Sequence, residues 1–395
     1  MKRIFGNAVA LLGSLAFALV LAELFLRVLG FSRPVFVRVD PVLGMAHIPG
    51  AEGWYSAEGR SYVRINASGW HDKEHPLKKP AGVTRIAILG DSYTDALQVP
   101  EDSAFPAILE RTLNSTLPGR YEVLNFGVGG FGTGQELLVL RHYALKYAPD
   151  AVILAFAIVN DVSDNSRALK RVDYLPYFKL VDERLVLDTS FRISRGFLRR
   201  ARIVGFLEQH FRVAQLARVA RLSAVADLEQ GRRARSGMSP IEFGVDNYRN
   251  PPRDSIWAEA WNVTESLISL INRECRSRHI PFYLVSLSSG TQVTPDTARR
   301  RVLAAELGVP DLFEAERRLE RLSIREGFDA LALAPLLASR AIATHEYYHG
   351  FGEYLGRGHW NERGHRVAAM LLSAWLAARL PRDLRPLHGN SAEGP

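Results

Sequence analysis

The 395-residue chain contains a single cysteine, Cys275, so it can form no intrachain disulfide. The apolar spacing around it predicts a helix over 266–278, and we interpret the thiol as a small core residue rather than a nucleophile. The sequence also lacks internal repeats and any recognised nucleic-acid-binding motif, so we expect no nucleic-acid partner. The composition that remains, 47% hydrophobic and 23% charged residues, is typical of a globular enzyme with a large core.

One long apolar run stands at the N-terminus. It extends from Ile4 to Ala22 behind Lys2 and Arg3, and about 20 apolar residues are enough to cross a bilayer as a helix. We expect residues 1–30 to form an uncleaved membrane anchor with a cytoplasmic N-terminus and an exported remainder. A cleavable signal peptide ending near residues 16–18 is the alternative.

The net charge of +8 is concentrated in one segment. Residues 190–235 contain eleven arginines against three acidic residues, which accounts for the whole excess. Apolar residues recur there every three or four positions, as in amphipathic helices with a basic outer face. Such helices either cap the catalytic domain or lie against anionic lipid headgroups.

From residue 84 onward, strand-like and helix-like segments alternate, which predicts a parallel sheet with helices on both faces. We divide the chain into an anchor, an extension over 31–83, a main domain over 84–380 with an insertion at about 165–255, and a disordered tail over 381–395. The expected strands are 85–89, 122–126, 151–156, 282–286 and 330–334, and the expected closing helix covers 366–380.

The first strand ends at Gly90-Asp91-Ser92. Open α/β sheets place reactive groups just beyond the carboxyl ends of their strands, and Gly90 allows the sharp turn that would point Ser92 outward. Ser92 is therefore a candidate nucleophile. A polar turn that caps a helix is the plainer interpretation of so short a motif.

Three further segments follow strand ends or precede the closing helix. The glycine-rich loop at 127–132 lacks the spacing of a dinucleotide-binding loop but suits an oxyanion loop, and Asn160 can supply a carboxamide donor. His359 precedes the last helix and can act as a general base. Turn chemistry and helix capping by Asn361 explain the same residues without catalysis.

Taken in order, these segments resemble the SGNH (GDSL-type) hydrolase family over about residues 84–380. The resemblance implies a flavodoxin-like three-layer sandwich, with a central parallel five-stranded sheet, that hydrolyses esters through an acyl-enzyme and uses no cofactor. It places Ser92 as nucleophile, His359 as base, and Gly130 and Asn160 with the Ser92 N–H in the oxyanion hole.

The sequence departs from that family at the acid. The family's acid usually stands three residues before the histidine, where this chain has Gly356. We expect either Glu353 or a backbone carbonyl to orient His359. Val159 also replaces the glycine that often precedes the asparagine.

Two other functions compete with an esterase. The segment His345-Glu346-Tyr-Tyr-His349 matches a zinc-peptidase motif, which requires both histidines on one face of a helix. A non-catalytic binding module that has lost its acid is the third hypothesis. For an exported esterase, we expect small acyl esters or O-acetylated glycans as substrates.

Overall fold

The computed structural model describes residues 2–190, 195–235 and 244–380. Its centre is a five-stranded sheet in the order β11-β10-β7-β5-β6, with every neighbouring pair parallel. The strands are β5 (Val83–Gly90), β6 (Arg120–Gly127), β7 (Ala151–Ala157), β10 (Phe282–Leu287) and β11 (Asp329–Ala332). This is the strand order of a flavodoxin-like fold, which the family resemblance implied. Strands form at all five expected places, although the last ends at Ala332 because a helix begins at Leu333.

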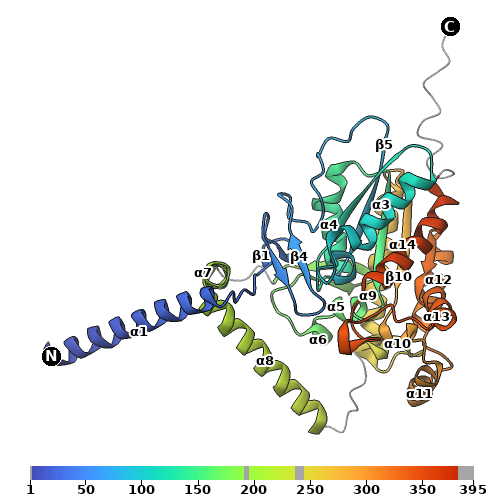
Figure 1. Ribbon diagram of the computed structural model, residues 1–395. Helices are drawn as coiled ribbons and strands as arrows, with labels where there is room; N and C mark the ends of the chain where they lie inside the picture. Colours follow the sequence, from blue (N-terminus) through green and yellow to red (C-terminus); the bar gives the residue numbers. More distant parts are fainter. Residues whose placement is uncertain (1, 191–194, 236–243, 381–395) are drawn as a thin grey trace.

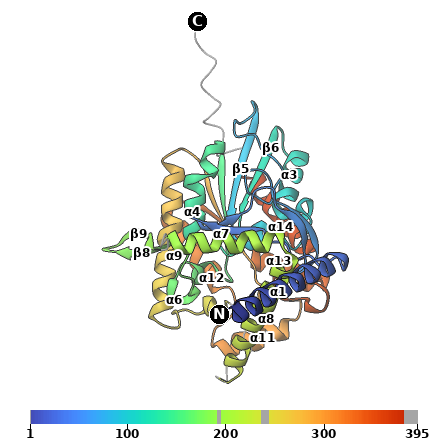
Figure 2. The same ribbon diagram turned by 90° about the vertical axis from the view of Figure 1, so that its left-hand side faces the viewer.

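Helices cover both faces of the sheet, as Figures 1 and 2 show. Residues alternate along β5, so that Ala87 and Leu89 face one core and Ile86 and Ile88 face the other. The helices on the first face are α4 (Thr133–His142), α9 (Ser255–Arg276) and α12 (Glu314–Glu326). Those on the second face are α3 (Phe105–Thr116), α13 (Leu333–Thr344) and α14 (Glu362–Ala377).

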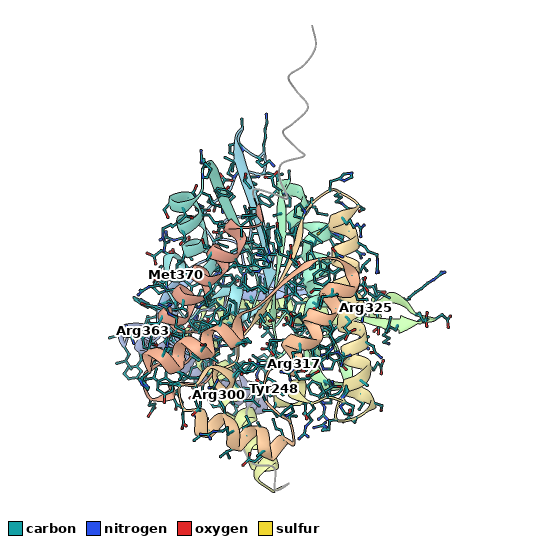
Figure 3. The ribbon with its side chains drawn as sticks, turned by 90° about the vertical axis from the view of Figure 1, so that its right-hand side faces the viewer. Tyr248, Arg300, Arg317, Arg325, Arg363 and Met370 are labelled. Atoms are coloured by element: carbon teal, nitrogen blue, oxygen red, sulfur yellow. The ribbon has the colours of Figure 1, made fainter. Side chains whose placement is uncertain are left out.

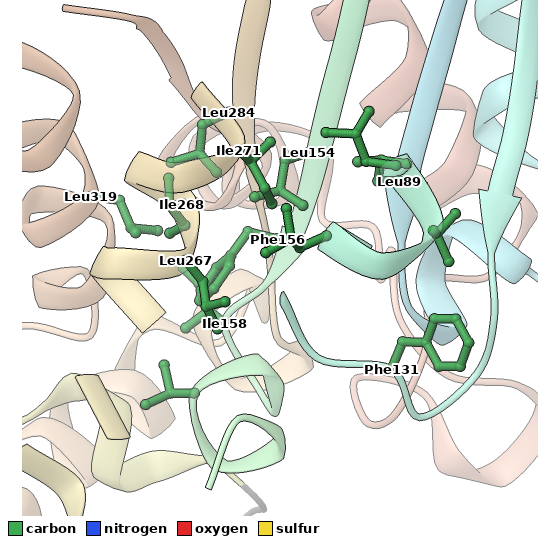
Figure 4. Close-up of a cluster of buried hydrophobic side chains, with 14 of the residues drawn as sticks. Leu89, Phe131, Leu154, Phe156, Ile158, Leu267, Ile268, Ile271, Leu284 and Leu319 are labelled. Carbon is green, nitrogen blue, oxygen red and sulfur yellow. The ribbon is translucent and has the colours of Figure 1, made fainter. Parts of the chain in front are cut away.

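The first core is the larger of the two. In it, Leu267, Ile268 and Ile271 of α9 pack against Leu154 and Phe156 of β7 (Figure 4). Burial on both faces explains why the strands read as continuous apolar runs. Cys275 is fully buried near the end of α9, as expected for a small core residue, and burial raises its pKa to about 12.

Shorter elements connect the layers. They are α2 (Ser92–Asp95), α5 (Asp161–Asp164), α6 (Arg167–Lys170), α10 (Gly290–Val293), α11 (Thr297–Leu307) and 3₁₀ turns at 101–103, 144–147, 245–248 and 352–354. The closing helix begins at Glu362, four residues earlier than expected, because the Asn361 side chain accepts hydrogen bonds from the Arg363 and Gly364 N–H groups. The tail over 381–395, expected to be disordered, lies outside the described residues.

The extension forms two small antiparallel pairs beside the main sheet. One pair is β1 (Val37–Asp40) with β2 (Gly44–His47), and the other is β3 (Glu52–Tyr55) with β4 (Ser61–Arg64). The Ser61 hydroxyl donates to the Leu97 carbonyl, and the buried His47 ring faces the Asp95 carboxylate at 3.2 Å. The extension therefore reaches the residues that follow Ser92.

The insertion contains the expected hairpin, β8 (Tyr177–Val181) with β9 (Arg184–Asp188), followed by α7 (Arg195–His210) and α8 (Arg212–Arg235). We expected the apolar residues of these two helices to lie beneath a basic outer face, and the structure does not show this. Val204, Leu207 and Leu216 are all exposed, although the spacing suggested that they pack inward.

The N-terminal helix, α1 (Lys2–Val28), projects from the body of the molecule (Figure 1). Its segment Phe5–Val28 is long and apolar enough to cross a membrane, and none of its most apolar window is buried. A membrane span and a signal sequence share these properties.

Candidate active site

The site begins where β5 ends. Gly90 is the last residue of that strand, and a side chain there would collide with the Thr94 hydroxyl, so only glycine fits. The Asp91 carboxylate then accepts a hydrogen bond from the Tyr93 N–H at 3.0 Å and caps α2. Ser92 is thus the first residue of a short helix at the carboxyl edge of the sheet, as the sequence predicted.

Three side chains form a continuous hydrogen-bonded line. The Ser92 Oγ lies 2.8 Å from the His359 Nε2, and the His359 Nδ1 lies 2.5 Å from the Glu58 Oε2. The other Glu58 oxygen accepts a hydrogen bond from the His359 backbone N–H at 2.7 Å. Burial raises the pKa of Glu58, but the hydrogen bonds and charge of His359 outweigh it and lower that pKa overall. The Glu58 carboxylate is therefore ionised and fixes the imidazole ring.

The expectation that Glu353 orients His359 is wrong in this geometry. Glu353 lies exposed on a 3₁₀ turn, and the carboxylate at the His359 Nδ1 comes from the extension. Glu58 sits in the turn between β3 and β4, 301 residues before His359. One indirect signal in the sequence is Gly358, the residue before His359. A side chain at this position would collide with the Glu58 carboxylate, so the glycine leaves room for an acid from another part of the chain.

The glycine loop and Asn160 lie next to Ser92, as expected. Gly130 has a φ of +82°, which favours glycine, and it borders the same cavity as Ser92 and Asn160. Within the described chain, the N–H groups of Ser92 and Gly130 donate to no protein acceptor. The Asn160 Nδ2 donates a hydrogen bond to the Asp164 Oδ2 at 2.9 Å, and the Asn160 side chain also interacts with the buried Asp91 carboxyl group, so two acidic residues hold this amide at the edge of the cavity.

Asp95 fixes the position of that glycine loop. Its Oδ2 accepts a hydrogen bond from the Gly129 N–H at 3.0 Å and also faces the buried His47 ring. The turn that follows β5 is held in place by Asn125, whose side-chain amide donates a hydrogen bond to the Thr94 carbonyl. The loop therefore depends on contacts from both the first strand's turn and the extension.

Four carboxyl groups lie buried behind the site, on Asp91, Glu136, Asp161 and Asp164. Burial raises the pKa of each, well above the usual range for Glu136 and Asp161 and to about 6 for Asp164. Burial and the neighbouring carboxyl groups therefore favour the neutral forms of Glu136 and Asp161. This limits the negative charge next to a site where an oxyanion would develop.

The cavity above Ser92 has a volume of about 300 Å³. Its lining includes Tyr93, Val159, Ser289 and, from the insertion, Lys170. The Lys170 ammonium pairs with the Asp164 carboxylate at 2.6 Å and lies 3.3 Å from the Gly130 carbonyl. The cavity is therefore small, with one polar side formed by the loop, Asn160 and this ion pair.

The zinc-peptidase motif lacks the helix that it requires. Helix α13 ends at Thr344, and His345 has a φ of +55° outside it. His349 lies in a bridge to Trp360, where its Nε2 is 2.9 Å from the Ser288 hydroxyl and its Nδ1 is 2.8 Å from the Gly358 carbonyl. His349 therefore supports the loop that carries His359, and across residues 2–190, 195–235 and 244–380 no cluster of three metal-ligating side chains occurs.

No family model and no curated protein sequence matches the chain. Among solved structures, the fold is similar to the acetyl xylan esterase AlAXEase, at 13% identity and a TM-score of 0.38 over 74% of this chain and 98% of that one. A catalytic mutant of Axe2, an acetylxylan esterase from Geobacillus stearothermophilus, is 11% identical with a TM-score of 0.36 over 76% of this chain and 94% of that one. A two-domain esterase active on acetylated mannans is 13% identical with a TM-score of 0.38, over 80% of this chain and 53% of that one. At these similarities, the function has to be argued from the geometry of Ser92, His359 and Glu58.

Proposed function

We propose that this protein is a serine ester hydrolase of the SGNH type, with Ser92 as nucleophile, His359 as general base and Glu58 as the acid. One observation carries the proposal. A serine at the carboxyl edge of a parallel sheet, a histidine nitrogen 2.8 Å from its oxygen and a carboxylate on the other ring nitrogen form the arrangement that activates a hydroxyl for acyl transfer.

The reaction follows from these positions. The Ser92 Oγ attacks the ester carbonyl while the His359 Nε2 takes its proton, and Glu58 stabilises the imidazolium that forms. The N–H groups of Ser92 and Gly130 and the side-chain amide of Asn160 hold the oxyanion, and each such donor contributes about 3 kcal/mol to lowering the barrier. The protonated His359 then gives its proton to the departing alcohol. Water, activated by the same base, releases the acid from Ser92.

We propose acetyl esters of glycans as the substrate class. The cavity of about 300 Å³ suits a small acyl group, and its open side can admit an extended alcohol component. The proteins of similar fold that are named as acetyl xylan or acetylated-mannan esterases agree with this choice. We further propose that α1 spans the membrane with its N-terminus in the cytoplasm, which places the active site outside.

The test is acetate release from acetylated xylan and mannan oligosaccharides, with p-nitrophenyl acetate as a general ester. We expect turnover by the wild type and a loss of at least about 10³-fold in S92A and H359A, because each variant removes a reacting group. Thermal unfolding of each variant serves as the control for folding. Absence of ester hydrolysis by the folded wild type would favour a binding module instead.

A further inference from the structure

Helix α7 carries apolar side chains on its outer surface. Ile203 is 53% exposed and Phe206 is 55% exposed, and Leu207 is exposed beside them. The helix contacts β1, and its half-buried residues include Leu198 and Ala201. A surface helix in water buries most of its large apolar residues, whereas α7 leaves Ile203, Phe206 and Leu207 exposed.

Arginines stand among these apolar side chains. Arg199, Arg200 and Arg202 are all exposed, and none forms a salt bridge with any residue that the structure describes.

Two arginines on the face opposite α1 differ in this respect. There, Arg317 pairs with Asp311 and Arg325 pairs with Glu265 (Figure 3). The exposed side of α7 is therefore both apolar and rich in uncompensated positive charge.

The end of α7 is tied to the N-terminal helix. Leu207 and Phe211 border a groove whose other wall is α1 from Leu19 to Leu24. Leu19 stands nine residues before the end of α1 at Val28, which corresponds to about 13 Å along a helix. The junction of α7 and α8 is thus level with the last apolar turns of α1.

Polar contacts fix this junction. The Glu23 carboxylate accepts a hydrogen bond from the Val213 N–H at 3.0 Å, and Arg27 donates to the His210 carbonyl at 2.8 Å. The first turn of α8 and the last residue of α7 are therefore satisfied by side chains of α1 rather than by water.

The orientation of α7 agrees with these contacts. In Figure 1 α1 runs outward from the body while α7 is seen end-on at its base, and in Figure 2 α7 is seen along its length. Helix α7 therefore lies across the direction of α1. A bilayer that α1 crosses would meet the exposed side of α7.

We infer that α7, together with Phe211 at its end, is an interfacial helix that lies in the headgroup layer of the membrane spanned by α1. Its outer apolar side chains insert between acyl chains, and its arginines bind anionic lipid phosphates. The inference rests on the proposed membrane anchor. Two attachments, α1 and α7, would hold the catalytic domain in one orientation on the membrane surface.

Depth-dependent fluorescence quenching tests this placement. The full chain is reconstituted into vesicles of three parts phosphatidylcholine to one part phosphatidylglycerol, with nitroxide-labelled lipid as quencher. A fluorophore is attached to F206C, to L12C within α1 and to I324C, an exposed apolar position on α12. The buried Cys275 is the only native cysteine, and the labelled wild type is the blank.

We expect lipid quenching at position 206 to exceed that at 324 by at least about threefold and to approach that at 12. Adding R199Q, R200Q and R202Q to F206C should abolish the increase in quenching that phosphatidylglycerol causes over phosphatidylcholine alone.

Three results would overturn the inference. Quenching at 12 with none at 206 would leave the anchor intact and place α7 in water. Shielding of 206 from both lipid quencher and aqueous iodide would mean that protein, such as a second copy, covers α7. Absence of quenching at 12 would remove the anchor and α7's membrane contact together, without affecting ester hydrolysis.

Discussion

Glu58, which the sequence did not predict, orients His359 in the structure. It holds His359 through both carboxylate oxygens, one on the ring and one on the backbone N–H. A carboxylate in this position selects the imidazole tautomer that leaves Nε2 free to accept the serine proton. The resemblance stated from the sequence placed the acid at position 356, which is a glycine here, whereas in the structure the carboxylate beside His359 comes from a distant turn.

Replacing Glu58 tests that assignment. We expect E58Q to lower kcat by about 10²- to 10⁴-fold with little change in KM, because the amide loses the charge that stabilises the imidazolium. Steady-state kinetics with p-nitrophenyl acetate measure the effect. E353Q is the matched control and should retain wild-type kcat, because Glu353 is exposed and does not contact His359. A large loss in E353Q with none in E58Q would reverse the assignment.

Glu58 also makes a predictable contribution to stability. Its folded pKa lies below the usual value, so its stabilising contacts are present above the ordinary pKa of a glutamate and are lost as pH falls through the lowered value. Ionisation of Glu58 therefore does not limit activity near neutral pH.

At the scale of elements, the strands of the sheet could be predicted and the position of the acid could not. The strands β5 and β7 are buried on both faces, so their apolar runs are unambiguous. Glu58 lies in a short turn whose residues have no periodicity, and its partner is far away in sequence. Ser92, Gly130 and Asn160 were predictable because each follows a strand end, which topology brings to one edge.

The amphipathic helices of the insertion show what apolar spacing cannot predict, which is the surroundings of the apolar side chains. The spacing of apolar residues in α7 indicated a stripe, but periodicity does not say what covers the stripe. In the structure, Val204 and Leu207 of this stripe are exposed, and Leu207 borders a groove whose other wall is α1. The end of α7 is held by a contact with α1, in which Arg27 donates to the His210 carbonyl, and no local pattern encodes a contact between residues so far apart in the sequence.

The contact between α12 and α10 gives a stability prediction. The Glu316 carboxyl is fully buried and accepts a hydrogen bond from the Gln292 amide at 2.6 Å, and burial raises its pKa to about 8. The unfolded chain ionises this group near pH 4.5, so between there and pH 8 the unfolded state binds fewer protons. The free energy of unfolding therefore falls as pH rises through this window, by an amount on the order of 2–4 kcal/mol.

The variant E316Q should lose this pH dependence, because glutamine keeps the acceptor oxygen and cannot ionise. Thermal unfolding in detergent at pH 5 and pH 8.5 measures the difference from wild type. E320Q, at an exposed position on the same helix, should behave as wild type. Equal pH dependence of unfolding in E316Q and wild type would show that ionisation of Glu316 does not lower the free energy of unfolding.

At the scale of the whole molecule, the extension, the main domain and the insertion each contribute to one site. The extension supplies Glu58 and His47, the main domain supplies Ser92 and His359, and the insertion supplies Lys170 to the cavity. The domain boundaries predicted from the sequence remain predictions, but the extension is more than a covering layer. Its removal would take away the acid.

The proposed esterase activity depends most on Ser92 being a nucleophile that His359 and Glu58 activate. The most direct test is reaction of the full chain with a fluorophosphonate, followed by intact mass spectrometry and peptide mapping. We predict one adduct per chain on Ser92, no adduct in S92A, and labelling of E58Q that is slower by at least about 10²-fold. A folded wild-type protein that remains unlabelled, or that is labelled equally in S92A, would contradict the account.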